Sequence, residues 1–508
     1  MLLILKKAGR LLIVLYLLIQ CCAASVLAQS GTEFFVAVDG SDSSGVGSSV
    51  NPWATIEHAL GQVPDSSSVI VRSGTYLGRI RLNRVFTNGV TVRAEQSYQA
   101  RLRHNSTVIT CFTAKGITLE GFDIAHEGVG AGALIIQIQD LIGAPGGSDF
   151  VSRITLRNNI LHDSFNNDIL KINNGAGQIT VEGNIFYNQS GSDEHIDINS
   201  VRDIIVQDNI FFNDFGGSGR SNGNDTSSYI VVKDSNANDD SNLGSHNISI
   251  RRNVFLNWEG SSGSNFVLIG EDGQAYYEAQ NVLVENNLML GNSGNVMRAA
   301  FGVKGSKDIT FRNNTVVGDL PSLAYAMRLN REGSNLANVN IQFYNNIWSD
   351  PSGTMGAENS SRPNDFSDTP PADTTSFTLE NNLYYNGAQP IPTNSSELVN
   401  FSDDSKQIVS NPGLPTHTGV VLPRWNPSSN TFQDGSLTIR AAFEKLVTSY
   451  AALSTGSPAL DGANASQAPA EDILGNSRAA ADIGAFELVG DDLAPAPPKD
   501  VRPIAGIN

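Results

Sequence analysis

The chain has 508 residues, of which 40% are hydrophobic and 17% charged, a balance typical of a folded globular protein rather than a disordered one. Its formal net charge of −18 argues against nucleic-acid binding, which needs an excess of Lys and Arg to neutralise phosphates. An acidic protein can still bind an acidic polymer where local cations or a bridging metal ion offset the repulsion.

Residues 1–28 have the organisation of a secretory signal peptide. A basic start precedes the apolar core LLIVLYLLI, and Val26–Ala28 offers a small-residue cleavage site. The apolar core is too short to span a bilayer comfortably, and no later stretch of 18 apolar residues occurs. We therefore expect a protein that is secreted, periplasmic or at the cell surface and free of the membrane once the signal is removed. Lipidation at Cys21 is a weaker alternative.

Residues 34–60 predict a strand, a Gly/Ser loop and a short amphipathic helix near Trp53–Leu60, with Asn51-Pro52 as its entry. The order of a strand, DGSD, Pro-Trp-Ala-Thr-Ile and V-x-x-G-T-Y resembles the opening of many secreted right-handed parallel β-helix proteins. In that group the helix caps the open end of the coil, where core and backbone donors would otherwise be exposed.

A repeat then follows in which a short β-branched strand leads to an Asn, two apolar residues and a polar turn. A unit of about 25 residues with loop insertions explains the spacing, and it is too short for a βαβ crossover with its partner strand. Short strands broken by Asn and Gly favour an all-β, parallel β-helix with one turn per unit. We expect the repeated Asn to stack as a ladder at one corner. Its members are Asn159, Asn184, Asn209, Asn253, Asn287, Asn314, Asn346 and Asn382.

The alternation of apolar residues predicts which side chains of the second strands point outward. Lys171 lies between two inward residues, and so does Asp197, which we expect to stack on Lys171 from the next coil about 4.8 Å away. Lys233 is expected one coil further and two residues along the same surface. The same alternation predicts that His195 points outward, either as a general acid or, as we favour, as a turn residue.

Four carboxylates gather within two coils of this surface. Such a group repels itself unless a cation lies among its members, and a set of oxygen ligands suits Ca²⁺. A solvated acidic turn without an ion is the alternative. The four are Asp168, Asp193, Glu194 and Asp197.

The sequence DEHID at 193–197 resembles the D-D-x-x-D motif of the family 9 polysaccharide lyases, pectate lyases with a right-handed parallel β-helix. The resemblance implies that these three acids, with Asp168 one coil earlier, bind Ca²⁺. It also implies that Lys233 is the catalytic base, since the family carries a Lys on the following coil. The chain departs from the family at Glu194, which replaces an Asp, and after Lys233, where Asp-Ser replaces Leu-Gly-Gly.

Other cations near this surface have two interpretations each. Lys171 is either an alternative base or, as we favour, a charge partner of Asp197. Arg298 and Arg328 are expected at one outward register on later coils, where they could hold substrate carboxylates bidentately, although they could equally be exposed strand residues.

Downstream of the repeats the sequence becomes irregular. We divide the chain into a solenoid at 29–390, an irregular C-terminal cap at 391–490 and a Pro-rich tail at 491–508. A helix is expected at 438–452. The run of S-P-A-x-D, D-x-x-G-x-x-R and D-I-G-A-x-E within 453–490 resembles a segment that closes the last coil of many bacterial β-helix proteins.

These observations predict a monomeric, Ca²⁺-dependent lyase that cleaves an acidic polysaccharide such as pectate by β-elimination. Within the enzyme class, the alternatives are a lyase for alginate or another uronate polymer and a glycoside hydrolase, which would use two carboxylates without the Lys. From a different class, the alternative is a non-catalytic glycan-binding β-helix that keeps calcium for stability.

Overall fold

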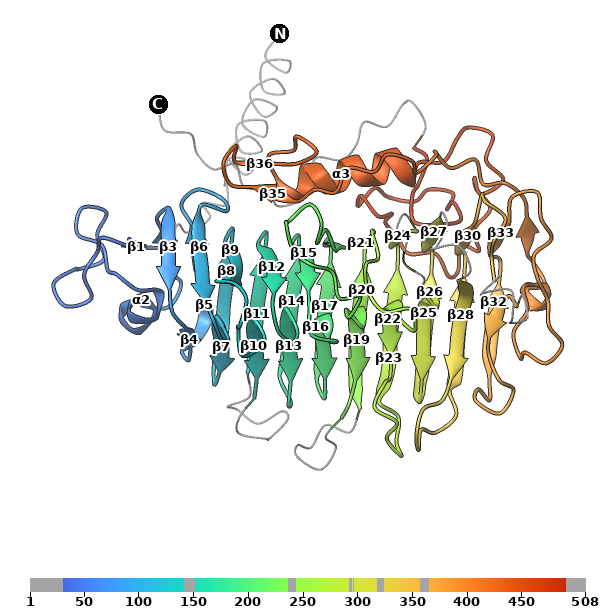
Figure 1. The fold of residues 1–508 in the computed structure, drawn as a ribbon, viewed down its shortest axis with the longest axis horizontal. Helices are drawn as coiled ribbons and strands as arrows, with labels where there is room; N and C mark the ends of the chain where they lie inside the picture. The colour runs from blue at the N-terminus through green and yellow to red at the C-terminus, as the bar shows by residue number, and fades with distance from the viewer. Residues whose placement is uncertain are drawn as a thin grey trace, which may run out of the picture.

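A computed structural model describes residues 31–140, 151–235, 244–291, 295, 297–317, 324–356 and 365–489 of the chain. Three all-parallel sheets of 12, 10 and 12 strands run along its length (Figure 1). Successive turns of the chain add one strand to each sheet, which confirms the parallel β-helix. The expected signal peptide at 1–28 and the tail at 491–508 lie outside the described residues. Among the described residues, no helix is long and apolar enough to cross a membrane.

The strands of each sheet follow one another in chain order. Sheet 1 contains β1 (Glu33–Val36), β2 (Ser68–Val71), β5 (Val85–Ala94), β8 (Lys115–Glu120), β11 (Ser152–Arg157), β14 (Gly177–Glu182), β17 (Arg202–Gln207), β20 (Ser245–Arg251), β23 (Ala279–Glu285), β26 (Ser306–Arg312), β29 (Val339–Tyr344) and β32 (Phe377–Glu380). Sheet 2 contains β4 (Ile80–Leu82), β7 (Ile109–Phe112), β10 (Ile136–Gln139), β13 (Leu170–Asn173), β16 (Glu194–Asn199), β19 (Ser228–Lys233), β22 (Asn265–Ile269), β25 (Ala299–Lys304), β28 (Tyr325–Asn330) and β31 (Ser367–Asp368). Sheet 3 contains β3 (Gly74–Leu77), β6 (Ala100–His104), β9 (Asp123–His126), β12 (Ile160–Ser164), β15 (Ile185–Gln189), β18 (Ile210–Phe212), β21 (Val254–Phe255), β24 (Leu288–Leu290), β27 (Thr315–Val317), β30 (Ile347–Ser349), β33 (Leu383–Tyr385) and β34 (Ile408–Val409).

The Asn ladder lies at the corner between sheets 1 and 3, as predicted. The Asn184 backbone N–H and Nδ2 both donate to Oδ1 of Asn209, at 2.9 and 3.0 Å, and Nδ2 also donates to the Leu156 carbonyl at 2.9 Å. The same contacts recur from coil to coil down to Asn382, whose Nδ2 donates to Asp404 at 2.9 Å. All eight Asn are buried, so the ladder satisfies backbone groups that water cannot reach.

Replacing Asn209 with alanine is expected to lower the free energy of unfolding by about 3–5 kcal/mol. The change would leave the Asn184 backbone N–H and the Val181 carbonyl buried without these partners, at roughly 1–3 kcal/mol for each unsatisfied group. It would also remove one of the two hydrogen bonds made by Asn184 Nδ2 and one of the two accepted by Asn253 Oδ1. Chemical denaturation followed by circular dichroism measures the effect, with the exposed Asn105→Ala as the control. Equal midpoints for the two variants would contradict a structural role for the ladder.

Inside the coil, aromatic side chains stack along the axis. The rings of Phe186, Phe211 and Phe255 lie parallel at centroid spacings of 4.9 and 5.0 Å. His195 joins this core: it is fully buried, its ring lies 4.5 Å from that of Tyr229, and burial lowers its pKa to about 3. The prediction that His195 points outward was therefore wrong, because alternation breaks down at the corner where β16 begins.

The N-terminal end of the core is covered by α2 (Ile56–Gln62), which confirms the expected capping helix. Thr55 caps the helix by accepting a hydrogen bond from the His58 N–H, and Asp42 in turn accepts from Thr55. Ile56 and Leu60 pack into the main core of the solenoid.

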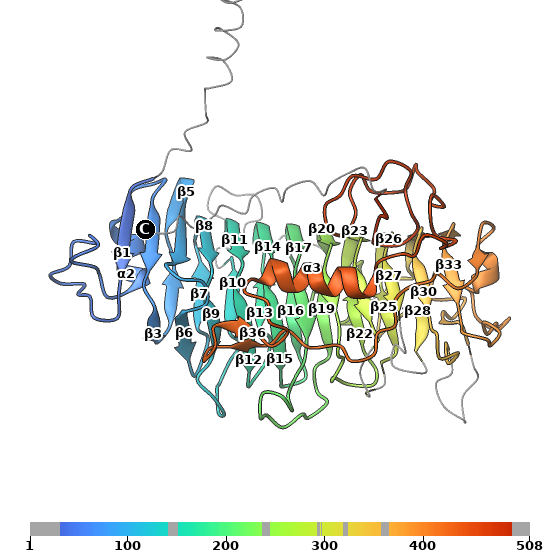
Figure 2. The same ribbon diagram turned by 90° about the horizontal axis from the view of Figure 1, so that it is seen from above.

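The C-terminal segment runs back along the solenoid over the outer face of sheet 3 (Figures 1 and 2). It forms the hairpin β35 (Trp425–Asn426) and β36 (Thr431–Phe432) and then α3 (Ile439–Tyr450), which confirms the helix expected at 438–452. A single 3₁₀ turn, η1 (Phe401–Asp403), precedes them.

Residues 453–490 do contact the last coil, where Asn381 Nδ2 donates to the Gly462 carbonyl at 2.7 Å. They then run back along the solenoid: two coils before the last, Asn313 donates to the Asp482 carbonyl at 3.0 Å, and the Ala485 N–H donates to Thr315 Oγ1 at 2.9 Å. The residues that pack against the core at this end are Val399 and Phe401, so the expectation that 453–490 close the last coil was wrong. The physical reason is that sheet 3 is apolar on its outer face as well as its inner one and needs a cover. Its outward residues packed beneath the segment include Ile160, Ile185, Tyr187, Ile210, Phe212, Val254, Leu256, Leu288 and Leu290.

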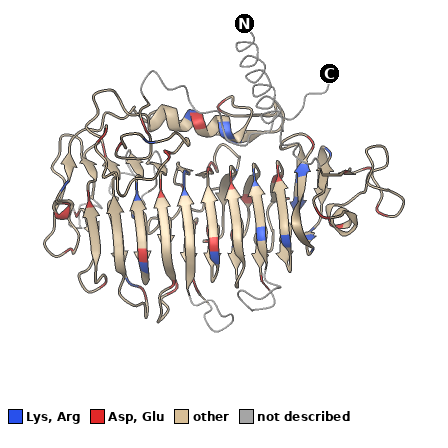
Figure 3. Cartoon of the chain, turned by 180° about the vertical axis from the view of Figure 1, so that it is seen from behind, with Lys and Arg blue, Asp and Glu red and all other residues tan. Residues whose placement is uncertain are grey.

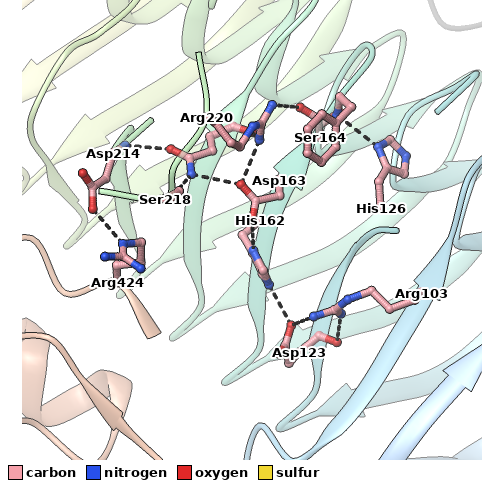
Figure 4. A network of polar contacts seen from close by, with 12 residues as sticks. Arg103, Asp123, His126, His162, Asp163, Ser164, Asp214, Ser218, Arg220 and Arg424 are labelled. Carbon is pink, nitrogen blue, oxygen red and sulfur yellow. Dashed lines mark hydrogen bonds and ion pairs between the residues drawn. The ribbon is translucent and has the colours of Figure 1, made fainter. Parts of the chain in front are cut away.

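A polar network fastens the edge of this cover to sheet 3 (Figure 4). The two ring nitrogens of His162 lie 2.7 Å from Asp123 and 2.7 Å from Asp163. Burial works against a charged ring, but the two carboxylates hold the pKa of His162 above its ordinary value. Arg220, from the loop after β18, bonds Asp163 at 2.8 Å, and the same loop meets the C-terminal segment through an Asp214–Arg424 ion pair at 2.8 Å.

The outer face of sheet 1 differs from that of sheet 3. In the view of Figure 3, charges of both signs gather near the ends of the strands while much of the sheet is uncharged. Arg157 there lies 2.9 Å from Glu120 and 3.6 Å from Glu182 on the two neighbouring strands. Such pairs keep the ends of adjacent parallel strands compatible with water.

Candidate active site

The outer face of sheet 2 carries the predicted site. Lys171 pairs in register with Asp197, and Asn199, two residues after Asp197, pairs with Lys233. Both lysines therefore occupy the positions expected from the sequence. The inward neighbours on these strands are buried in the solenoid core, and this leaves the outward side chains only one face to occupy.

Three of the four predicted acids form a close group at the end of sheet 2 where the strands begin. Ligand oxygens of Asp168, Asp193 and Glu194 all lie within 4.8 Å of one another. Asp168 and Glu194 are almost fully buried, and the Glu194 N–H donates to Asp168 Oδ1 at 3.0 Å, which ties one coil to the next. Asp197 lies beside this group, where its Oδ2 accepts a short hydrogen bond from Lys171.

Several oxygens of these acids are buried with no hydrogen-bond partner among the described residues: Oδ2 of Asp168, Oε2 of Glu194 and Oδ1 of Asp197. Burial, together with the charge of Asp197, raises the pKa of Asp168 to about 7. Burial also raises the pKa of Glu194 well above its ordinary value, and that of Asp193 is raised. Buried carboxylates are costly to ionise unless a cation lies among them. A group of converging carboxylate oxygens fits a hard divalent cation such as Ca²⁺, which would offset that cost.

Two carboxylates that the sequence analysis did not assign to the site hold Lys233. Its Nζ lies 2.6 Å from Glu271 Oε2 and 3.7 Å from Asp272 Oδ2. Burial alone would lower the pKa of Lys233, but the charges around it, Asp197 and Glu271 foremost, hold it above its ordinary value. Glu271 and Asp272 follow β22 and Gly270, which places them one coil beyond Lys233, but they lie 38 and 39 residues downstream of it and no local sequence pattern pointed to the contact.

The loop that carries Glu271 and Asp272 is rigidly built. Glu278 accepts hydrogen bonds from the N–H groups of Glu271 and Asp272, at 2.8 and 2.9 Å. Tyr276 donates to the Asp234 carbonyl at 2.9 Å, next to Lys233 in the chain. The Asp234 carboxylate points into a turn, where it accepts from Ser200 Oγ at 2.6 Å, and so it does not compete for the Lys233 amine.

The two arginines do not share a register, so that prediction was wrong. Arg328 pairs with Gly302, whereas Arg298 directly precedes β25, four residues before Gly302. Arg328 lies in the Lys171–Asp197 column but four coils beyond Asp197, roughly 19 Å at the usual strand spacing, and it bonds Asp368 at 2.7 Å. Neither arginine belongs to the acidic group.

Comparison with solved structures shows the fold. The chain is similar to pectate lyase Pel9A, with a TM-score of 0.50, 14% sequence identity, and coverage of 90% of this chain and 97% of that one. It is also similar to the GH136 lacto-N-biosidase from Eubacterium ramulus, with a TM-score of 0.49, 10% identity, and coverage of 74% and 68%. No family model and no curated protein matches the sequence. The similarity to Pel9A agrees with the parallel β-helix and, at 14% identity, shows the fold alone.

Proposed function

We propose that this protein is a Ca²⁺-dependent polysaccharide lyase that cleaves a uronate-containing glycan by β-elimination, and that residues 1–28 direct its export. The carrying observation is the converging group of Asp168, Asp193 and Glu194 on sheet 2 beside two lysines, in which one oxygen each of Asp168 and Glu194 is buried without a hydrogen bond from the described residues. Lys171 Nζ approaches the Asp168 oxygen only to 3.8 Å. The fold shared with pectate lyase Pel9A supports the proposal.

Asp168, Asp193 and Glu194 would hold the ion, with Asp197 at its side. A bound Ca²⁺ would neutralise the uronate carboxylate and so stabilise the enolate-like charge that develops when the C5 proton leaves. Lys233, as the neutral amine, takes that proton; the C5–H electrons form the C4–C5 double bond as the C4–O bond breaks. Water protonates the departing sugar oxygen. Glu271 and Asp272 hold Lys233 in place and stabilise the ammonium that results.

A hydrolase is less well supported, because the acids converge on one point instead of flanking a bond as separate acid and base. A non-catalytic calcium-binding β-helix would explain the acidic group. It would not explain the half-enclosed amine that a dedicated loop holds beside that group.

The proposal is tested by incubating the purified protein with polygalacturonate, alginate and other uronate polymers in the presence of Ca²⁺. Unsaturated, ultraviolet-absorbing product that disappears on chelation is expected. Release of reducing ends without ultraviolet absorbance would indicate a hydrolase. The absence of both signals would favour the non-catalytic glycan-binding alternative.

The rate should rise with pH across the neutral and alkaline range at saturating Ca²⁺. The pKa of Lys233 lies above its ordinary value, so each unit of pH below that pKa leaves about tenfold less of the neutral amine. The raised pKa values of Asp168 and Glu194 add a loss of Ca²⁺ affinity below about pH 7. Initial rates between pH 6 and pH 10 check this expectation, and an optimum on the acid side of pH 7 would contradict a lysine base.

A further inference from the structure

Two outward columns of side chains run along sheet 2 and through the proposed site, each column holding one residue from every coil. On the four coils β7, β10, β13 and β16, the pairs in register are Thr110 and Phe112, Gln137 and Gln139, Lys171 and Asn173, and Asp197 and Asn199. Apart from the Lys171–Asp197 ion pair, this surface consists of amides, one hydroxyl and one aromatic ring.

Three of the four amides of this surface, those of Gln137, Gln139 and Asn199, are oriented by hydrogen bonds. Gln137 Nε2 donates to Gln139 Oε1 at 2.8 Å. Asn199 donates to Ser235 Oγ at 2.7 Å and accepts from the Ser235 N–H at 3.1 Å. Asn173 is almost buried, and its Oδ1 has no hydrogen-bond partner among the described residues. Amides both donate and accept, which is the pattern that sugar hydroxyls require.

Beyond Lys233 the surface changes character but does not gain free charge. The residues of the first column are Val231, on the same strand as Lys233, and then Leu268 and Gly302 on the next two coils. A Cβ atom at Gly302 would lie 2.6 Å from Asn265 Oδ1 and 2.9 Å from Leu268. Every Lys or Arg that the described residues place on the two columns contacts a carboxylate of the chain itself. These cations are Arg81, Lys171, Lys233, Lys304 and Arg328.

A homopolymer of uronates laid along these columns would bring about one carboxylate for each coil, because a sugar residue and the coil spacing of about 4.8 Å are of similar length. Those carboxylates would meet amides, apolar side chains and cations that are already paired. They would also approach a chain of net charge −18, whose field opposes a dense polyanion. A glycan with one uronate at the acidic group and uncharged sugars on either side places no carboxylate on the amides and apolar side chains. Its lower charge density also reduces the repulsion by the negatively charged protein.

We infer that the substrate is a heteropolysaccharide in which the uronate that is cleaved is flanked by neutral sugars, the sugar over Gln137, Gln139 and Asn173 being one of them. This inference rests on the proposed lyase function and specifies its substrate class. The neutral sugar binds through hydroxyl groups to these amides, and the half-exposed ring of Phe112 offers a stacking face one coil further.

The test compares initial rates on a glycan whose backbone alternates galacturonate with rhamnose, on polygalacturonate and on alginate, all with Ca²⁺. The alternating polymer is expected to give at least a tenfold higher kcat/KM. Gln137→Lys should reduce the ratio of kcat/KM on the alternating polymer to kcat/KM on polygalacturonate. The new lysine supplies an unpaired cation for a polygalacturonate carboxylate and so raises kcat/KM on that polymer. Gln178→Lys, an exposed position on sheet 1, is the matched control and should leave the ratio unchanged.

The outcomes separate the inference from the proposed function. Equal or faster cleavage of either homopolymer overturns the inference and leaves the lyase proposal standing. If no polymer is cleaved, the lyase proposal fails, and isothermal titration with the same three polymers decides the inference. Tighter binding of the alternating polymer would then support its part that concerns binding, the preference for a uronate flanked by neutral sugars. Equal or tighter binding of a homopolymer, or no binding, would reject the inference.

Discussion

Lys233→Ala is expected to reduce the rate of β-elimination by about 10²–10⁴-fold, the usual contribution of a positioned general base. The loss should fall on kcat, because Lys233 meets the C5 proton in the transition state and contributes little to holding the chain of sugars. Stopped or continuous ultraviolet assays at saturating substrate and Ca²⁺ measure it. The melting temperature of the variant should fall, because the change removes the ion pair with Glu271 and leaves that carboxylate and Asp272 without their cation. The rate is therefore measured at a temperature where circular dichroism shows both proteins folded.

A matched control is available on the same surface. Lys304 occupies the column of Lys233 two coils further on, and it too is bound to a carboxylate from a following loop, that of Glu332. Lys304→Ala removes the same kind of ion pair and should retain most of the activity. If Lys233→Ala keeps full activity and Lys171→Ala loses it, the catalytic base is Lys171, the lysine that contacts Asp197. Lys171 lies two coils before Lys233, in the neighbouring column.

Asp168→Asn is expected to have opposite effects with and without Ca²⁺. The folded-state pKa of Asp168, about 7, lies above that of an unfolded chain, near 3.9. Its contribution to stability is therefore present in acid and is lost as pH rises towards and past 7. At pH 8 without the ion, the parent holds a buried charge that the variant lacks, so the variant should melt higher by about 2 °C or more.

Adding Ca²⁺ should reverse that order. An ion at a hundred times its dissociation constant stabilises the parent by about 2.7 kcal/mol, whereas the variant has lost a ligand and should bind at least about 100-fold more weakly. Thermal unfolding at pH 8 in chelator and in millimolar Ca²⁺ checks both halves. The exposed Asp39→Asn serves as the control and should respond to Ca²⁺ like the parent. If Ca²⁺ raises the melting temperature of Asp168→Asn by as much as that of the parent, Asp168 is not a ligand of the ion.

The elements that the sequence predicted well are those set by short-range patterns. The eight ladder Asn follow a strand of alternating apolar residues at the same place in each coil, and the structure stacks them all. The facing of Lys171 and Asp197 follows from the same alternation, because one coil of a parallel solenoid repeats the register of the last. The N-terminal helix was also predicted from a local signal, its apolar side, although it begins at Ile56 after the cap Thr55 and not at the predicted entry Asn51-Pro52.

The errors arose where a corner or a long-range contact decided the outcome. His195 sits where β16 begins, and at such a corner two successive residues can both point inward. Arg298 and Arg328 are separated by an insertion, whose length hides the register of the two strands. Glu271 and Asp272 reach Lys233 from 38 and 39 residues downstream, across a coil, and no local pattern connects them.

The sequence alone therefore determined the coil: its repeat, its ladder and the outward direction of the two lysines and of Asp197. Each of these depends on residues within one turn of chain, and parallel stacking then propagates the pattern. The tertiary structure alone decided that three acids converge at the start of the strands of sheet 2, that a loop from the next coil holds the Lys233 amine, and that the C-terminal segment folds back over sheet 3. Those features depend on loop conformation and on the burial of an outer apolar face, which side-chain periodicity does not encode.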